Sequence, residues 1–204
     1  MNAVSRTFPL PSFDPLALHL RLAPEGPGLL ESASLSPRTG RCSIVPLRRT
    51  ESYRLDGRGL ARIDDRGETF LDGDPFAALS AILETRRIAA PSVGAFFPGG
   101  FFGYLSYDFA GRIERLPHRA LRDRPVPELW LDWVDLTAVY DYRQHTLTLA
   151  SLDPDEDLAA LEREVRHSLA SPLPPPAAVS SGRMRPQSGR EAFCLLYTSD
   201  AADE

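Results

Sequence analysis

A stretch rich in proline and serine, residues 171–187, limits what this chain can fold into. Its sequence, SPLPPPAAVSSGRMRPQ, has neither the alternation of a strand nor the period of a helix. Such a composition is typical of an extended linker, because proline lacks a backbone donor and serine adds no apolar surface. We therefore predict one domain over residues 1–170, then the linker, and a new segment that begins at Ser188.

The part before the linker combines short strand-like runs with three helical segments. Aspartate followed by proline supplies an N-cap and a first helical residue at Asp14, Asp74 and Asp153. These pairs predict a short first helix and longer helices over 74–87 and 155–170. Turn formers separate the apolar runs, so the sequence predicts an α+β domain built on an antiparallel β-sheet with flanking helices. The strand-like runs are residues 28–34, 41–47, 53–55, 59–63, 69–71, 101–107, 129–140 and 146–151.

Composition excludes several classes of function. All 23 basic residues are arginine, which removes Schiff-base chemistry and a phosphate-loop lysine. The net charge of −5 argues against a broad nucleic-acid-binding face, and Cys42 and Cys194 have no zinc-ligand spacing. No run approaches the roughly 20 apolar residues of a membrane span, and the N-terminus lacks the pattern of a signal peptide. We expect a cytoplasmic protein without nucleic-acid or membrane partners.

Two local patterns that suggest binding are better explained by structure. Trp130 and Trp133 lie three apart on a predicted strand and so on opposite faces, which argues against a platform for sugars. The glycines of Pro98–Gly103 lack a phosphate-loop lysine, so they indicate a tight turn into a buried strand. A basic segment is interpreted as a solvated loop, with anion steering or a partner contact as the alternative. Its arginines are Arg112, Arg115, Arg119, Arg122 and Arg124.

Four segments of the domain occur in a recognisable order. They are Gly28-Leu-Leu-Glu-Ser32, Gly40-Arg-Cys-Ser43, Pro98-Gly-Gly-Phe-Phe-Gly-Tyr-Leu-Ser-Tyr-Asp108 and Arg112-Ile-Glu-Arg-Leu-Pro117. Together they resemble the N-terminal domain of the chorismate-aminating synthases, component I of anthranilate synthase and of aminodeoxychorismate synthase. The likeness covers residues 8 to 170, and residues 188–193 resemble the start of the family's chorismate-binding domain. It implies a sheet that forms part of a larger β-sandwich with helices outside.

The last eleven residues, 194–204, break from this likeness. Their sequence, CLLYTSDAADE, looks like the translation of an adapter used in sequencing libraries, and its apolar run has no helical stripe to join. We interpret 194–204 as a non-native tail and the chain as the truncated front part of a longer protein.

The resemblance implies an enzyme that acts on chorismate. In such synthases ammonia from a glutamine amidotransferase, component II, attacks chorismate held against Mg²⁺ in the C-terminal domain. That domain holds the catalytic residues and the metal ligands, so this fragment should have neither and should be inactive alone. We predict component I of aminodeoxychorismate synthase, which makes 4-amino-4-deoxychorismate for folate synthesis. Anthranilate synthase component I, of tryptophan synthesis, is the alternative, and the preference rests on the run Phe101–Asp108 and on Cys42.

The resemblance also implies that the fragment keeps half of a tryptophan-binding pocket. Cys42 stands where the family has an aromatic residue, which weakens packing against an indole ring. Glu31 and Arg41 are equally well explained as a cross-strand ion pair. A non-enzymatic tryptophan-sensing or partner-binding module is the alternative from another class. The residues that match the pocket motifs are Glu31, Ser32, Thr39, Gly40, Arg41 and Cys42.

Overall fold

The computed structural model describes residues 2–31, 40–88, 97–115 and 124–174, and beyond them residues 182, 185–186, 189–192 and 194–195. The chain divides into two compact units, Met1–Pro172 and Leu173–Glu204. In the second unit residues 190–192 and 194–195 are helical, and Ser188 lies outside the described residues. Within the described part, no helix is both long enough and apolar enough to cross a membrane.

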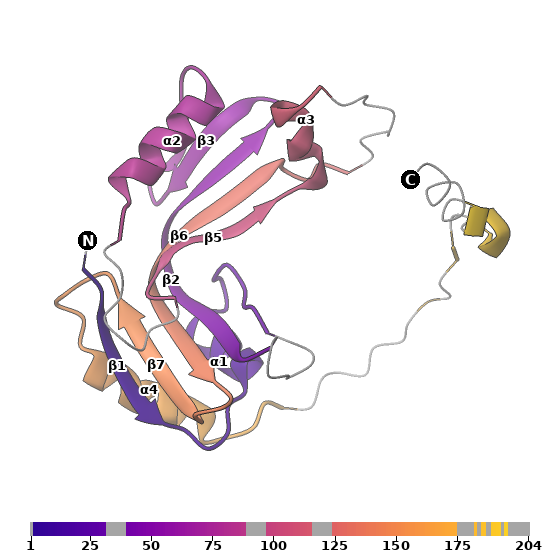
Figure 1. Ribbon diagram of the computed structural model, residues 1–204. Helices are drawn as coiled ribbons and strands as arrows, with labels where there is room; N and C mark the ends of the chain where they lie inside the picture. Colours follow the sequence, from indigo (N-terminus) through magenta and orange to yellow (C-terminus); the bar gives the residue numbers. More distant parts are fainter. Residues whose placement is uncertain are drawn as a thin grey trace. The chain divides into compact units, whose positions relative to one another are not determined.

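Seven strands of the described chain form one antiparallel sheet (Figure 1). The strand order is β1-β7-β6-β2-β3-β4, and β5 pairs with β6 outside this path. The fold is therefore α+β on an antiparallel sheet, as the sequence predicts. The strands are β1 (Val4–Pro9), β2 (Cys42–Asp56), β3 (Gly59–Asp64), β4 (Gly67–Phe70), β5 (Gly100–Leu105), β6 (Leu129–Asp141) and β7 (Thr146–Ser151).

Two long strands, β2 and β6, connect the two halves of this sheet. They pair along most of their length, with register shifts between Pro46 and Glu51. Residues Leu129–Val134 of β6 also pair with β5, whereas Leu136–Asp141 pair with β7. Irregular pairing of this kind increases the local twist of a strand, so the sheet changes direction there. Figure 1 shows β2 passing from one half to the other.

The continuity of β2 corrects one prediction. The runs 41–47 and 53–55 are not separate strands but parts of one strand of 15 residues. Arginines and a glutamate interrupt the apolar alternation between the runs, yet the backbone stays extended because these side chains find charged partners. Arg48, for example, donates to Asp135 on β6 at 2.8 Å.

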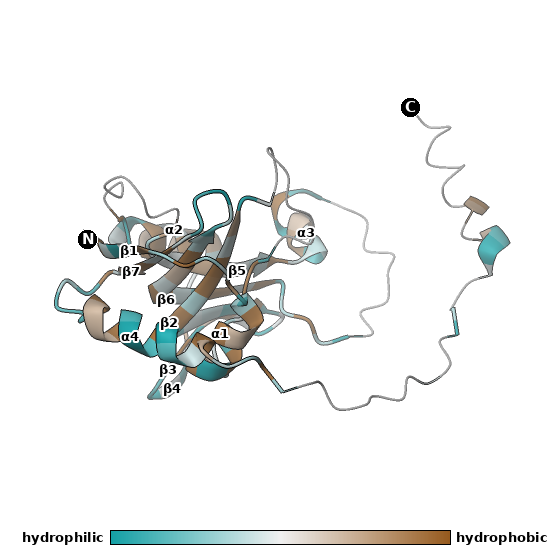
Figure 2. Cartoon of the chain, turned by 90° about the horizontal axis from the view of Figure 1, so that it is seen from below, coloured by the Kyte–Doolittle hydropathy of each residue, from teal (hydrophilic) through white to brown (hydrophobic). Residues whose placement is uncertain are grey.

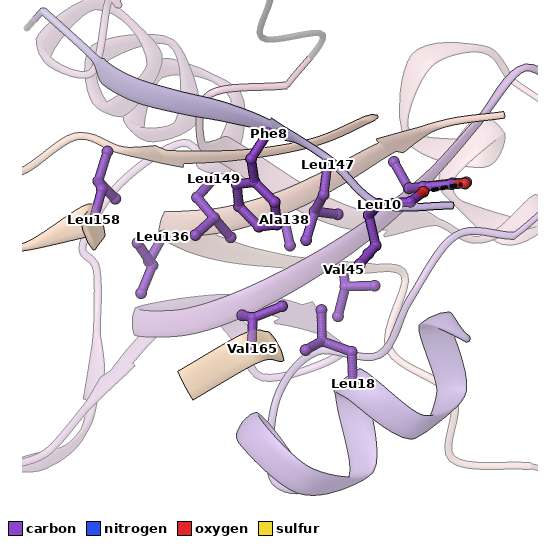
Figure 3. Packing of buried hydrophobic residues seen from close by; sticks show 11 residues of the cluster. Phe8, Leu10, Leu18, Val45, Leu136, Ala138, Leu147, Leu149, Leu158 and Val165 are labelled. Carbon is purple, nitrogen blue, oxygen red and sulfur yellow. Dashed lines mark hydrogen bonds between the residues drawn. The ribbon is translucent and has the colours of Figure 1, made fainter. Parts of the chain in front are cut away.

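Each half of the sheet has its own apolar core. Helices α1 (Pro15–Leu22) and α4 (Leu158–Leu169) pack on the half that contains β1 and β7. Leu18 and Val165 are fully buried there, and Figure 3 shows both reaching from the helices toward the strands. Helix α2 (Pro75–Thr85) has no fully buried residue, and its side chains pack at the edge of the second core.

The helices begin where polar side chains cap them. Asp14 and Asp74 accept the backbone N–H groups of Ala17 and Ala77 at 2.8 and 2.9 Å, which confirms both predicted starts. Helix α4 begins at Leu158 instead of residue 155. Figure 2 shows brown and teal residues side by side on α1 and on the central strands, as expected of elements with one buried side.

The late start of α4 follows from competing turns. The carboxylate of Asp153 accepts the N–H of Asp155 at 3.0 Å, which closes a turn before the helix. Asp157 then accepts the N–H groups of Ala159 and Ala160, so it is the N-cap. The prediction of a helix from residue 155 was therefore wrong at its first turn.

The segment 98–103 is a tight turn into a strand, as predicted, but the strand is not buried as expected: Gly103, Tyr104 and Leu105 are exposed. Gly99 and Gly100 have φ values of 135° and 128°, which side chains rarely adopt, and β5 begins at Gly100. After β5 come the short helices η1 (Tyr107–Phe109) and α3 (Ala110–Ile113). Large apolar side chains lie exposed along this region, among them Leu105, Tyr107 and Ile113.

Candidate functional site

The residues of the predicted tryptophan pocket lie at the beginning of β2. Leu30 and Ile44 exchange two backbone hydrogen bonds of 2.9 Å, so the segment before Glu31 runs antiparallel to β2. Glu31 is exposed, and Gly40 has a φ of 73° just before the strand. Ser32 and Thr39 lie outside the described residues. Of the predicted strand pair 28–34 and 41–47, the described residues therefore show a single β-bridge, between Leu30 and Ile44.

Arg41 forms its ion pair with Asp141 on β6. Its Nε and Nη2 atoms donate to Oδ2 of Asp141 at 2.9 and 2.6 Å. The other oxygen of Asp141 accepts the backbone N–H groups of Arg143 and Gln144 at 2.8 and 3.2 Å. The predicted ion pair between Glu31 and Arg41 was thus wrong, because the carboxylate that Arg41 contacts belongs to Asp141. The Arg41 guanidinium lies between the start of β2 and the end of β6. A ligand that binds there would have to compete with Asp141 for its positive charge.

The thiol of Cys42 adds an apolar surface to this end of β2. Burial raises the pKa of Cys42, and the charge of Asp141 raises it further against the opposing effect of Arg41. The thiol is therefore neutral near pH 7, and it lies half-buried and free of any disulfide. It offers a ligand a small contact surface and no charge.

The Arg41–Asp141 pair predicts how stability responds to acid. Burial raises the pKa of Asp141, but the hydrogen bonds from Arg41, Arg143 and Gln144 outweigh it and hold the pKa below its usual value. A carboxyl group with a lowered pKa in the folded state stabilises the fold above about pH 4 and loses that contribution as the pH falls through its folded pKa. We expect Asp141→Asn to lower the melting temperature at pH 7 but not at about pH 2.

Melting curves between these pH values test this prediction. Asp65→Asn is the matched control, because Asp65 is an exposed carboxylate in the turn between β3 and β4. The control should follow the unsubstituted chain at every pH. An Asp141→Asn variant that loses the same stability at both ends of the pH range would contradict the role assigned to the charge.

A second candidate site, which the sequence reasoning missed, lies at the turn between β2 and β3. Here a cavity of about 700 Å³ is bounded by the turn and by the segment that precedes β6. Only Arg124 and Trp130 among its residues were singled out from the sequence. The sequence signal for this site was the pair of arginines that flank Asp56-Gly57, together with the distant segment Arg-Pro-Val-Pro at 124–127. The lining residues are Arg54, Asp56, Gly57, Arg58, Arg124, Pro125, Val126, Pro127 and Trp130.

The two tryptophans of β6 do not form a binding platform. Trp133 is 3% exposed, with the Arg86 guanidinium 4.8 Å above its ring and Phe101 against it at 4.9 Å. Trp130 is half-buried and donates its indole N–H to Asp132 at 3.1 Å. A coplanar exposed pair is therefore excluded, and with it the sugar-binding alternative.

The chain offers no magnesium site in its described part. Among those residues, no group of three or more His, Cys, Asp or Glu side chains is placed to hold a metal ion. The buried carboxylates Glu51 and Asp132 are engaged by arginine, serine, tyrosine or tryptophan donors. These residues therefore do not fit a magnesium ion.

Comparison with known proteins gives the class of the chain. No protein-family model matches the sequence. The chain is 33% identical over 186 residues to anthranilate synthase component 1 of Thermus thermophilus, which covers 88% of this chain and 39% of that protein. It is 31% identical over 176 residues to aminodeoxychorismate synthase component 1 of Bacillus subtilis, covering 84% and 36%.

Solved structures agree on the fold. Anthranilate synthase component I from Streptococcus pneumoniae superposes with a TM-score of 0.57 at 18% identity, covering 92% of this chain and 42% of that one. The chain is thus a homologue of the component I synthases and has their fold. These homologues are, in particular, component I of anthranilate synthase and of aminodeoxychorismate synthase. The chain spans less than two fifths of the length of either curated relative.

Proposed function

We propose that this chain is the non-catalytic front part of a chorismate-aminating synthase that forms 4-amino-4-deoxychorismate. The observation that carries the proposal is the similarity to two component I synthases over 88% and 84% of the chain. Identities of 33% and 31% favour neither product. The preference for the aminodeoxy product rests on the run Phe101–Asp108 and on the small Cys42 in place of an aromatic residue.

In this proposal catalysis belongs to a part of the protein outside the described residues. Amination of chorismate expels a ring hydroxyl, which needs a metal ion or a proton donor at a fixed position. The whole protein would bind Mg²⁺ and chorismate there and receive ammonia from a glutamine amidotransferase. Exposed apolar residues near β5, such as Tyr107 at 92% exposure, support the idea that further protein covers this edge. Tryptophan binding and a place in the cytoplasm stay predictions.

The protein encoded by the complete gene tests the proposal. Incubated with chorismate, ammonium and Mg²⁺, it should yield 4-amino-4-deoxychorismate, identified by chromatography and mass. Residues 1–204 alone should yield no product, because they lack the reactive site in this proposal. Formation of anthranilate and pyruvate would select the alternative synthase. Failure of the complete protein to consume chorismate would overturn both.

A further inference from the structure

The cavity at the β2–β3 turn combines positive charge with an apolar wall. Its volume of about 700 Å³ falls within the range of small-molecule sites, roughly 300 to 1,000 Å³. Arginines line it together with Trp130, Val126 and two prolines, and Arg54 pairs directly with Trp130 across β2 and β6. A ligand that fills the cavity would therefore meet both guanidinium groups and an apolar surface.

Two of the arginines share a pair of carboxylates. Arg54 contacts Asp56 through Nε at 2.9 Å and also bonds Glu68, and its side chain is only 16% exposed. Arg54 is thus held in place by two carboxylates.

Arg58 is held less firmly than Arg54. Its Nη2 atom lies 3.3 Å from Asp56 and 3.7 Å from Glu68, and its side chain is 62% exposed. Both distances exceed the 2.7 to 2.9 Å typical of strong charge-assisted hydrogen bonds. Its backbone is nevertheless fixed, because the N–H of Arg58 donates to Asp56 at 2.8 Å. The guanidinium, which also lies 5.4 Å from the centre of the Phe70 ring, can turn from these contacts toward a ligand without any change in the backbone.

Among the described residues, the third arginine adds positive charge to the cavity. No described carboxylate lies within ion-pair distance of Arg124, and Asp123, its neighbour in the sequence, lies outside the described residues. In the described part, Asp56 and Glu68 balance Arg54 and Arg58, so Arg124 adds a positive charge there on a chain whose net charge is −5. A local positive charge on an acidic protein attracts anions. Guanidinium groups bind carboxylates with matched, often bidentate, geometry.

The apolar wall is also held in place. The indole N–H of Trp130 donates to Asp132 at 3.1 Å, and Asp132 is 3% exposed and accepts Ser52 Oγ at 2.5 Å. The ring of Trp130 therefore cannot rotate freely. Pro125 and Pro127 are rigid by their own rings. A fixed indole and two prolines form a surface suited to a flat ring.

We propose that this cavity binds a small organic acid that carries a flat ring, with its carboxylate on Arg58 and Arg124 and its ring against Trp130. This site is separate from the predicted tryptophan pocket at the start of β2, and it does not depend on the proposed synthase function. Neither a large apolar molecule nor a simple inorganic anion would use both parts of the lining.

Titration with benzoate tests the proposal on the 204-residue chain labelled with ¹⁵N. The chain has two tryptophans, so the spectrum contains two indole N–H signals, and Trp130→Phe assigns them. Benzoate should shift the Trp130 signal until it saturates, and it should leave the signal of the buried Trp133 unchanged. Arg124→Gln and Arg58→Gln should each weaken the affinity about tenfold, the loss expected for one charge-assisted hydrogen bond.

Three controls make the result decisive. Benzamide has the same ring without the charge and should shift the signal far less than benzoate does. Acetate has the charge without the ring and should also bind more weakly. Arg163→Gln removes an exposed arginine on α4, far along the chain from the cavity, and should leave benzoate affinity unchanged. Equal effects of benzoate and benzamide, an unshifted Trp130 signal, or affinity unaffected by Arg124→Gln would each overturn the proposal.

Discussion

Gly103→Ala is expected to destabilise the domain by about 3 kcal/mol, at the upper end of what one added methyl group costs in a packed site. A β-carbon on Gly103 would lie far inside contact distance of the Trp130 carbonyl oxygen and 2.9 Å from its carbonyl carbon. Both atoms belong to the backbone of β6, so no flexible side chain can move away. Strand β5 must therefore shift from β6, its only partner strand in the described sheet.

Urea unfolding followed by tryptophan fluorescence measures this loss. Gly57→Ala is the matched control, because a β-carbon on Gly57 would meet nothing within 4 Å and its backbone needs no positive φ. The control should change stability by less than about 1 kcal/mol. Hydrogen exchange should also quicken along Gly100–Leu105 in the Gly103→Ala variant. An unfolding midpoint equal to that of Gly57→Ala would show that β5 tolerates a side chain at Gly103.

Local signals in the sequence predicted much of the fold. The aspartate-proline pairs placed the starts of α1 and α2, because a cap depends on residues only three apart. The turn formers between 53–55 and 59–63 predicted the β2–β3 hairpin, and those after residue 140 predicted the β6–β7 hairpin. Helix α4 was predicted to end at residue 170 and ends at Leu169, with Leu158 and Val165 buried. Each of these features is decided within one short segment.

Features that depend on distant segments were not predictable in the same way. The partner of Arg41 lies one hundred residues away on β6, and strand register, not sequence proximity, brings the two together. The continuity of β2 depends on charged partners elsewhere in the chain. The arginine cavity joins residues 54–58 to residues 124–130, so no single motif contains it. For the tryptophan pocket, the sequence placed Arg41 and Cys42 on a strand, while Ser32 and Thr39 lie outside the described residues.

Glu51→Ala is expected to cost about 2 to 3 kcal/mol, because it removes a buried carboxylate that several donors share. The Glu51 side chain is 3% exposed. It accepts the hydroxyl of Tyr53 at 3.0 Å and pairs with Arg62 at 2.7 Å and with Arg86. Burial, and then the Glu51 carboxylate, raise the pKa of Tyr53, so its hydroxyl stays protonated and donates. The expected loss of stability is smaller than that for breaking a fully buried ion pair, because water can solvate Arg62 and Arg86 once the carboxylate is removed.

The same change should loosen α2 from the sheet. This helix has no fully buried residue, and Arg86, its C-cap, reaches Glu51 on β2. Arg86 therefore ties the C-terminal end of this helix to the sheet. Faster hydrogen exchange along Pro75–Thr85 than in α4 would show the loosening.

Two variants separate the charge of Glu51 from its volume. Glu51→Gln keeps the shape but not the charge, so it should lose most of the stability that Glu51→Ala loses. Glu68→Gln is the control, since the ion pairs of this more exposed carboxylate should contribute less than about 1 kcal/mol. If Glu51→Gln were as stable as the unsubstituted chain, the carboxylate would act through packing alone, and α2 would be held by Leu79 and Ile82 against the second core.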